Sequence, residues 1–179
     1  KVVNYSLPGL GDIIGEKINN VSQWEKAKGK WLQIYASEMY GTFPSKKISV
    51  TSKLLVQKPI LNGKAEMNVW EVSLAGKVKI HLIGFIPLGT PVKAALLGLN
   101  FCGINTVFMD AEIPVSSKYV ICNENPFFNN HIATDKAVGT QKDTWQIEKV
   151  INAGYASFSV ACADFEEDFP DGYKKGVRT

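Results

Sequence analysis

The chain has 179 residues, about the length of one ordinary domain, of which 45% are hydrophobic and 21% are charged. This balance excludes a disordered chain, which combines few hydrophobic residues with a high net charge. The net charge is only +3, and because the 20 Lys and Arg residues are scattered among 17 Asp and Glu residues, we expect no nucleic-acid partner.

The N-terminal residues 1–27 are expected to form a lead-in and not a separate domain. Apolar residues at helical spacing between Ile13 and Val21 predict one short helix there. Asn4 and Asn20 each begin a sequence that matches the N-glycosylation acceptor pattern. These sites, and a sequence that begins without Met, predict a glycoprotein that is secreted or lies in the lumen of a secretory compartment. A sequence that was cut at this point from a longer one explains the missing Met equally well.

Three runs with a period of two then predict antiparallel β-strands. The first covers residues 47–57, the second residues 65–74 and the third residues 78–82. Turn-forming residues separate the runs, including Asn62-Gly63 and Ala75-Gly76. Connections this short imply that consecutive strands are antiparallel neighbours.

The region 84–103 is richer in Gly and Pro, and its residues 92–97 fit one helical turn or an apolar flap equally well. Strand signals resume at residues 105–113, 118–123 and 130–136. No part of the longest apolar stretch is expected to span a membrane, because charged and turn-forming residues interrupt it.

A helical period follows Gly139 and predicts a helix from Lys142 to Ala153. A last alternating strand is expected to place Phe158, Val160 and Cys162 on one face.

One motif carries a family resemblance. Gly29-Lys30-Trp31, at the start of a run that continues to Ala36, resembles the G-x-W motif at the beginning of the first barrel strand of lipocalins. Three further elements are similar to that family in position. They are the hairpin formed by residues 107–110 and 118–121, the strand at 130–136 and the C-terminal helix. Lipocalins normally have an Arg over the motif's Trp, whereas this sequence has Lys136 there, which keeps the cation but not the planar guanidinium.

The resemblance implies an all-β fold, an eight-stranded antiparallel up-and-down β-barrel with a short N-terminal helical lead-in and one C-terminal α-helix packed outside. The barrel domain would cover residues 28–165, and residues 166–179 would form a loose C-terminal tail. Trp31 and Lys136 would close one end of the barrel as a plug.

The apolar side chains that would face the interior of this barrel are the candidate ligand-binding residues. They are Tyr35, Val50, Leu54, Val56, Met67, Val69, Val78, Ile80, Leu82, Val107, Met109, Tyr119 and Ile121. Plain core packing accounts for any one of them equally well, but as a set they would form an apolar cavity suited to fatty-acid-like, retinoid-like or sterol-like cargo.

The implied function is that of a secreted carrier or scavenger of a small hydrophobic ligand. The alternative is an interaction module whose apolar segment 84–101 docks on a protein partner, on another copy of the chain or on a membrane surface, and this segment fits a lid over the barrel mouth equally well. An enzyme is not expected, because the sequence has no G-x-S-x-G, paired-carboxylate or Cys-His arrangement, although some lipocalins isomerise their ligands.

No cofactor or metal is expected, because His81 and His131 are the only histidines and neither has a partner at metal-ligand spacing. Three cysteines, Cys102, Cys122 and Cys162, allow at most one internal disulfide and leave one thiol free. Lipocalins often tie the C-terminal segment back to the barrel, so the resemblance implies a bridge from Cys162 to Cys102 or to Cys122.

Overall fold

The computed structural model describes residues 18–42, 45 and 47–177. The chain separates into two compact units, residues 1–47 and residues 48–179. The boundary expected between residues 27 and 28 falls inside a helix of the first unit.

The described part of the first unit is helical. Helix α2 (Val21–Tyr35) begins at Asn20, whose side-chain Oδ1 accepts a hydrogen bond from the Gln23 N–H at 2.9 Å. A π-helical turn, η1 (Ala36–Tyr40), follows it. The cap satisfies one of the backbone donors that the first helical turn leaves unpaired, and the Lys, Glu, Ala and Gln residues that follow favour a helix.

The expected first barrel strand at residues 29–36 is therefore wrong. Trp31 and Tyr35 lie one helical turn apart in α2, with ring centroids separated by 6.2 Å. The G-x-W triplet lies in a helix-forming context here, and three residues are too few to override the propensities around them.

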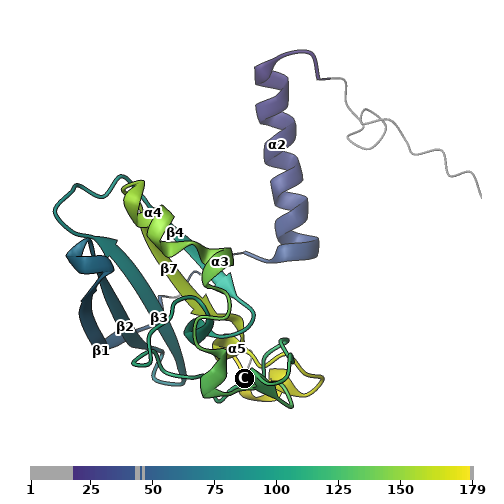
Figure 1. Ribbon diagram of the computed structural model, residues 1–179. Helices are drawn as coiled ribbons and strands as arrows, with labels where there is room; N and C mark the ends of the chain where they lie inside the picture. Colours follow the sequence, from purple (N-terminus) through teal and green to yellow (C-terminus); the bar gives the residue numbers. More distant parts are fainter. Residues whose placement is uncertain (1–17, 43–44, 46, 178–179) are drawn as a thin grey trace, which may run out of the picture. The chain divides into compact units, whose positions relative to one another are not determined.

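The second unit is built on a five-stranded mixed sheet with the spatial order β1-β2-β3-β7-β4 (Figure 1). Its strands are β1 (Val50–Ile60), β2 (Ala65–Leu74), β3 (Val78–Pro87), β4 (Ala95–Asn100) and β7 (Ala156–Ala161). Strands β1, β2 and β3 form two consecutive antiparallel hairpins, which confirms the prediction for these three runs. The first hairpin turns at η2 (Leu61–Gly63).

The expected eight-stranded barrel is wrong, because the sheet is open and contains a parallel pair. Strand β7 pairs with β3 in antiparallel orientation and with β4 in parallel orientation. Parallel neighbours need a long crossover connection, and residues 101–155 provide it. The fold is therefore a mixed α/β sheet and not an all-β barrel.

Most of the strands expected within this crossover are also wrong. Residues 105–113 contain part of the 3₁₀ turn η3 (Ile104–Thr106), and residues 118–123 form no strand. The region 130–136 contains only the end of a two-stranded ribbon and the beginning of another 3₁₀ turn; these elements are β5 (Phe128–Asn129), β6 (Ile132–Ala133) and η4 (Asp135–Ala137). Apolar residues of this region are buried without strand pairing, for example Val107 and Ile113 in the core beneath the sheet.

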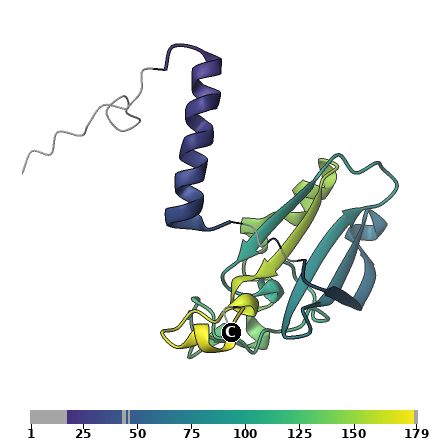
Figure 2. The same ribbon diagram turned by 180° about the vertical axis from the view of Figure 1, so that it is seen from behind.

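The predicted C-terminal helix is confirmed, with one break. It consists of α3 (Lys142–Trp145) and α4 (Ile147–Asn152), separated by Gln146 in the left-handed conformation with φ 47°. In Figures 1 and 2, seen from opposite sides, α4 lies along one face of the sheet. Ile147 and Ile151 of α4 are buried in the same cluster as Phe85 of β3, so this face carries the core of the unit.

The last strand, β7, ends at Ala161, so Cys162 belongs to the short helix α5 (Cys162–Phe165) that follows it. Beyond α5 the chain forms the 3₁₀ turn η5 (Gly172–Lys175). The Val177 N–H donates to the Phe165 carbonyl at 2.9 Å, so the described part of the C-terminal tail is hydrogen-bonded back to α5. Among the described residues, no helix is both long and apolar enough to cross a bilayer.

Candidate functional site

The parallel pair β4 and β7 defines one edge of the sheet as the candidate site. In sheets with parallel strands, ligands bind outside the carboxyl ends of the strands. Strand β4 ends at Asn100 and β7 ends at Ala161, and these two residues are register partners. We therefore define the carboxyl edge as the loop 101–103 that follows β4 together with helix α5 that follows β7.

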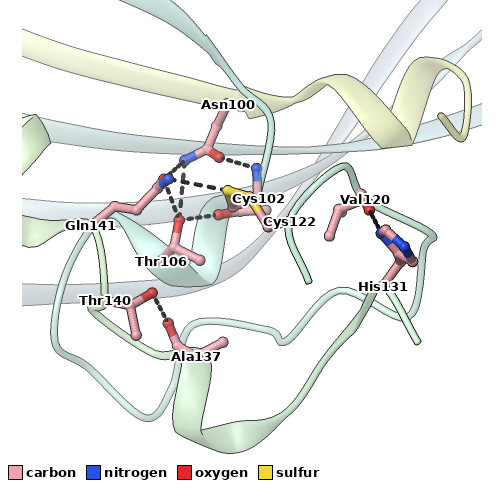
Figure 3. Close-up of a disulfide and its surroundings, with 10 residues drawn as sticks. Asn100, Cys102, Thr106, Val120, Cys122, His131, Ala137, Thr140 and Gln141 are labelled. Atoms are coloured by element: carbon pink, nitrogen blue, oxygen red, sulfur yellow. Dashed lines mark hydrogen bonds between the residues drawn. A yellow bond between two sulfur atoms is a disulfide. The ribbon is translucent and has the colours of Figure 1, made fainter. Parts of the chain in front are cut away.

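The loop 101–103 is held by a buried polar network, shown in Figure 3. The Cys102 N–H donates to the Asn100 Oδ1 at 2.6 Å. The Asn100 Nδ2 donates to the Thr106 Oγ1 and to the Gln141 Oε1, each at 3.2 Å. The Thr106 hydroxyl lies 2.8 Å from the Gly103 carbonyl oxygen and 2.9 Å from the Gln141 Oε1. Side chains of β4, η3 and the residue before α3 thus fix the backbone that leaves β4. Buried networks of this kind are rigid when satisfied.

A disulfide between Cys102 and Cys122 ties the same loop to the neighbouring segment of the crossover (Figure 3). The Gln141 Nε2 also donates to the Cys102 Sγ at 3.1 Å. The expected bridge from Cys162 is wrong, because Cys162 is free and half-buried in α5. Burial raises the pKa of the Cys162 thiol, which disfavours the thiolate.

A histidine and a buried carboxylate meet at the other side of the carboxyl edge. The Asp164 Oδ2 of α5 accepts a hydrogen bond from the His81 backbone N–H at 2.7 Å, and it lies 3.4 Å from the Nδ1 of the His81 ring. The hydrogen bond with the Asp164 carboxylate raises the pKa of His81, although desolvation opposes it. For residues 48–177, the structure records no hydroxyl or thiol hydrogen-bonded to the His81 ring.

The other histidine has a backbone partner. The Nδ1 of His131 lies 3.0 Å from the Val120 carbonyl oxygen (Figure 3), and its ring stacks on Tyr119. No three His, Cys, Asp or Glu side chains in the described part of the chain are grouped so that they could hold a metal ion.

The His81–Asp164 pair makes stability depend on pH. Because the folded protein binds the His81 proton more tightly than the unfolded chain, whose His pKa is about 6.5, protonation stabilises the folded state. This contribution is fully present below about pH 6.5 and is lost as the pH rises through the raised pKa of folded His81. We expect the free energy of unfolding to decrease from pH 6 to pH 8 by more in the wild type than in His81→Gln. Urea unfolding at a series of pH values measures both slopes, and equal slopes would contradict the pairing.

Eight of the residues expected to line a barrel lie in β1, β2 and β3 of an open sheet, and the other five lie outside the sheet. Met67, Val69 and Val107 are buried in the core, and Ile80 is buried as well. Val50, Leu54, Met109 and Ile121 are exposed, and Tyr35 lies in the exposed part of α2. Val56, Val78, Leu82 and Tyr119 are partly buried in the second unit.

The remaining expected sites are the barrel plug and the two glycosylation sites. Trp31 is in α2 of the first unit and Lys136 is an exposed residue of η4 in the second, so the plug that they were to form belongs to a fold that this chain does not have. Asn4 lies outside the described residues. Asn20 caps α2, and its glycosylation stays a prediction.

Sequence reasoning missed the residues that the structure brings together at the carboxyl edge. These are Asn100, Thr106 and Gln141 of the network and the pair His81–Asp164. One signal was present: the largely apolar run 95–99 ends at Asn100, which is followed by Phe-Cys-Gly. A polar residue directly after a short apolar strand is typical of the carboxyl end of a strand in an α/β sheet.

Comparison with known proteins agrees with the mixed sheet. No protein-family model matches the chain. The carbohydrate esterase MZ0003, from an unknown prokaryotic organism, is 28% identical over 175 residues, which cover 94% of this chain and 40% of that protein. The chain therefore spans less than half of the length of this curated relative.

Two similar solved structures are esterases. A promiscuous CE15 esterase from a marine bacterial metagenome superposes with a TM-score of 0.74 at 28% identity, covering 94% of this chain and 44% of that one. A glucuronoyl esterase from Solibacter usitatus has the same TM-score and identity and covers 99% of this chain and 46% of its own. A CE15 glucuronoyl esterase from Teredinibacter turnerae, at 16% identity and a TM-score of 0.54, supports the fold alone.

These findings overturn the lipocalin resemblance and the carrier function inferred from it. The similar proteins are esterases, so the expectation of a non-enzymatic protein is wrong as well. The expected partners, an apolar cargo or a surface docked through residues 84–101, are corrected with it, because the similar proteins are esterases and one of them is named as a carbohydrate esterase. The segment 84–101 contains the end of β3 and strand β4 of the sheet.

Proposed function

We propose that this chain is part of an esterase that hydrolyses carbohydrate esters, and that its substrates are esters of a uronic acid such as glucuronic acid. The observation that carries this proposal is that the sequence and the fold are both similar to esterases over nearly the whole chain. The carbohydrate esterase is 28% identical over an alignment that covers 94% of this chain, and the Solibacter usitatus glucuronoyl esterase superposes over 99% of it.

The carboxyl edge supports ester hydrolysis. This chemistry needs hydrogen-bond donors held rigidly where negative charge develops on the carbonyl oxygen. In α/β-hydrolases one of these donors is a backbone N–H in a loop that leads from a strand to a helix at this edge of the sheet. The loop 101–103 occupies such a position between β4 and η3. Gly103 has φ +101°, and a Cβ there would lie 2.7 Å from the Asn105 Oδ1, so the loop is built around a glycine backbone.

The disulfide supports the expected location. A Cys102–Cys122 bridge persists in oxidising compartments and is rare in a reducing cytosol. We therefore propose that the protein works outside the cell or in the lumen of a secretory compartment.

The test is hydrolysis of a simple uronate ester by the purified protein. Benzyl glucuronate is incubated with the protein, and the release of free glucuronic acid is followed by chromatography. The result expected is release that is proportional to protein concentration. Absence of release from glucuronate esters and from acetylated carbohydrates, by protein whose circular dichroism shows it folded, would refute the esterase function.

A matched pair of variants connects the activity with the carboxyl edge. Asn100→Ala removes the acceptor of the Cys102 N–H, and we expect a loss of about a hundredfold in kcat/KM, because a displacement of about 1 Å at a reacting centre has an effect of this size. Asn68→Ala is the control, since Asn68 is equally buried but bonds Glu66 within β2. It should lower stability without this loss of activity.

A further inference from the structure

A cavity of about 390 Å³ lies at the α5 side of the carboxyl edge and is not lined by the loop 101–103. Its walls come from the start of β3, the loop 114–118, helix α5 and the turn η5. The size falls within the range of small-molecule sites. All of these walls belong to the second unit.

The walls carry more positive than negative groups. Lys77, Lys79, Lys118, Lys175 and His81 line the cavity, and so do two carboxylates, Glu71 and Asp164. Several of the charges are already paired. The Lys79 Nζ lies 3.0 Å from the Glu71 Oε1, Asp164 faces His81, and the Lys118 Nζ lies 3.5 Å from the Glu167 Oε1.

Two cations remain without a carboxylate. Lys77, in the turn between β2 and β3, and Lys175, at the end of η5, form no ion pair with any residue that the structure describes. Both side chains belong to exposed residues, yet two segments far apart in the sequence bring them to one cavity. Like charges that line one cavity repel each other, and an anion bound between them relieves this repulsion.

Hydrogen-bond donors are available beside these cations. The Ser116 Oγ accepts the Lys118 N–H at 3.2 Å, which leaves the Ser116 hydroxyl proton for another acceptor. The neighbouring Ser117 is exposed and also lines the cavity. A protonated His81 supplies a second ring N–H in addition to the one that faces Asp164. Cations and neutral donors in one cavity are the groups that bind oxygen anions.

We propose that this cavity binds a small oxyanion, the carboxylate or phosphate group of a small molecule, between Lys77 and Lys175. The proposal goes beyond the esterase function and does not depend on it, since binding can be measured in the absence of any ester.

The experiment is a calorimetric titration of the whole protein at about pH 6 and low ionic strength, where surface charges are least screened. Three probes are compared at matched ionic strength: glucuronate, inorganic phosphate and neutral glucose. Saturable binding of at least one anion and none of glucose is the result expected. The anion that binds with the lower Kd identifies the oxyanion as a carboxylate or a phosphate. Proton NMR of the His81 ring should show a shift at the same concentrations.

The deciding comparison is between two double variants with the same loss of charge. Lys77→Ala/Lys175→Ala should weaken anion binding about tenfold or more, because each cation contributes a charge-assisted contact. Lys142→Ala/Lys149→Ala is the control, since both lysines are exposed residues of the second unit and do not line the cavity. Equal weakening in the two double variants, or no saturable binding of either anion to the wild type, would overturn the proposal. Thermal unfolding of each variant verifies its fold.

Discussion

Asp164→Ala is expected to lower the free energy of unfolding by about 3 kcal/mol. The Asp164 carboxylate is buried and accepts the backbone N–H of His81 at 2.7 Å, so its removal leaves a donor of β3 without its partner. It also removes the anion that faces the His81 ring. Since α5 and β3 meet through this residue, the carboxyl edge should loosen, and urea unfolding followed by tryptophan fluorescence measures the change.

Asp164→Asn separates the two contributions of this side chain. The amide oxygen still accepts the His81 N–H, but the charge is lost, so we expect a decrease of about 1 kcal/mol and a weaker dependence of stability on pH. An Asp164→Ala protein within about 0.5 kcal/mol of the wild type, the range of ordinary surface substitutions, would show that the pair has no structural role.

Cys102→Ala/Cys122→Ala is expected to lower the free energy of unfolding by about 3 kcal/mol. The bridge closes a loop of 20 residues, and in the chain-entropy model a loop of this length restricts the unfolded chain by about that amount. The variant should also lose esterase activity, because the loop 101–103 keeps only its polar network. Chemical denaturation with and without reductant measures the first effect.

Cys162→Ala is the matched control for the disulfide. Cys162 is free, so its replacement should change the free energy of unfolding by less than about 1 kcal/mol. Mass spectrometry after thiol labelling should find one reactive cysteine in the unfolded, unreduced protein. Labelling of three cysteines there would mean that the bridge does not form.

The parts of the fold that could be predicted were those specified by local patterns. The alternation in residues 65–74 indicated a strand with one buried face, and Met67 and Val69 indeed lie in the core. The helical period after Gly139 likewise indicated α3 and α4. In each of these elements the neighbours along the chain already determine which face is apolar.

The errors arose where partners distant in the sequence decide the structure. The apolar residues around Leu96 and Leu97 fitted a helical turn or a flap, but they form β4 because β7 supplies the hydrogen bonds of a parallel neighbour. Val107 and Ile113 alternate as in a strand, yet they are buried in a part of the crossover that forms no strand. A period of two indicates which residues face a core, but it does not indicate which strand, if any, pairs with the segment.

The sequence by itself determined the three N-terminal strands of the sheet, the C-terminal helix and the limit of one disulfide, because each depends on local periodicity or on a count. The tertiary structure alone decided that the sheet is open and mixed, that Cys102 pairs with Cys122, and that His81 meets Asp164 across 83 positions. Contacts this distant depend on which strands pair and in which direction. Closing so long a loop is an entropic cost that only the burial and hydrogen bonds of the complete sheet offset, and no local pattern records that balance.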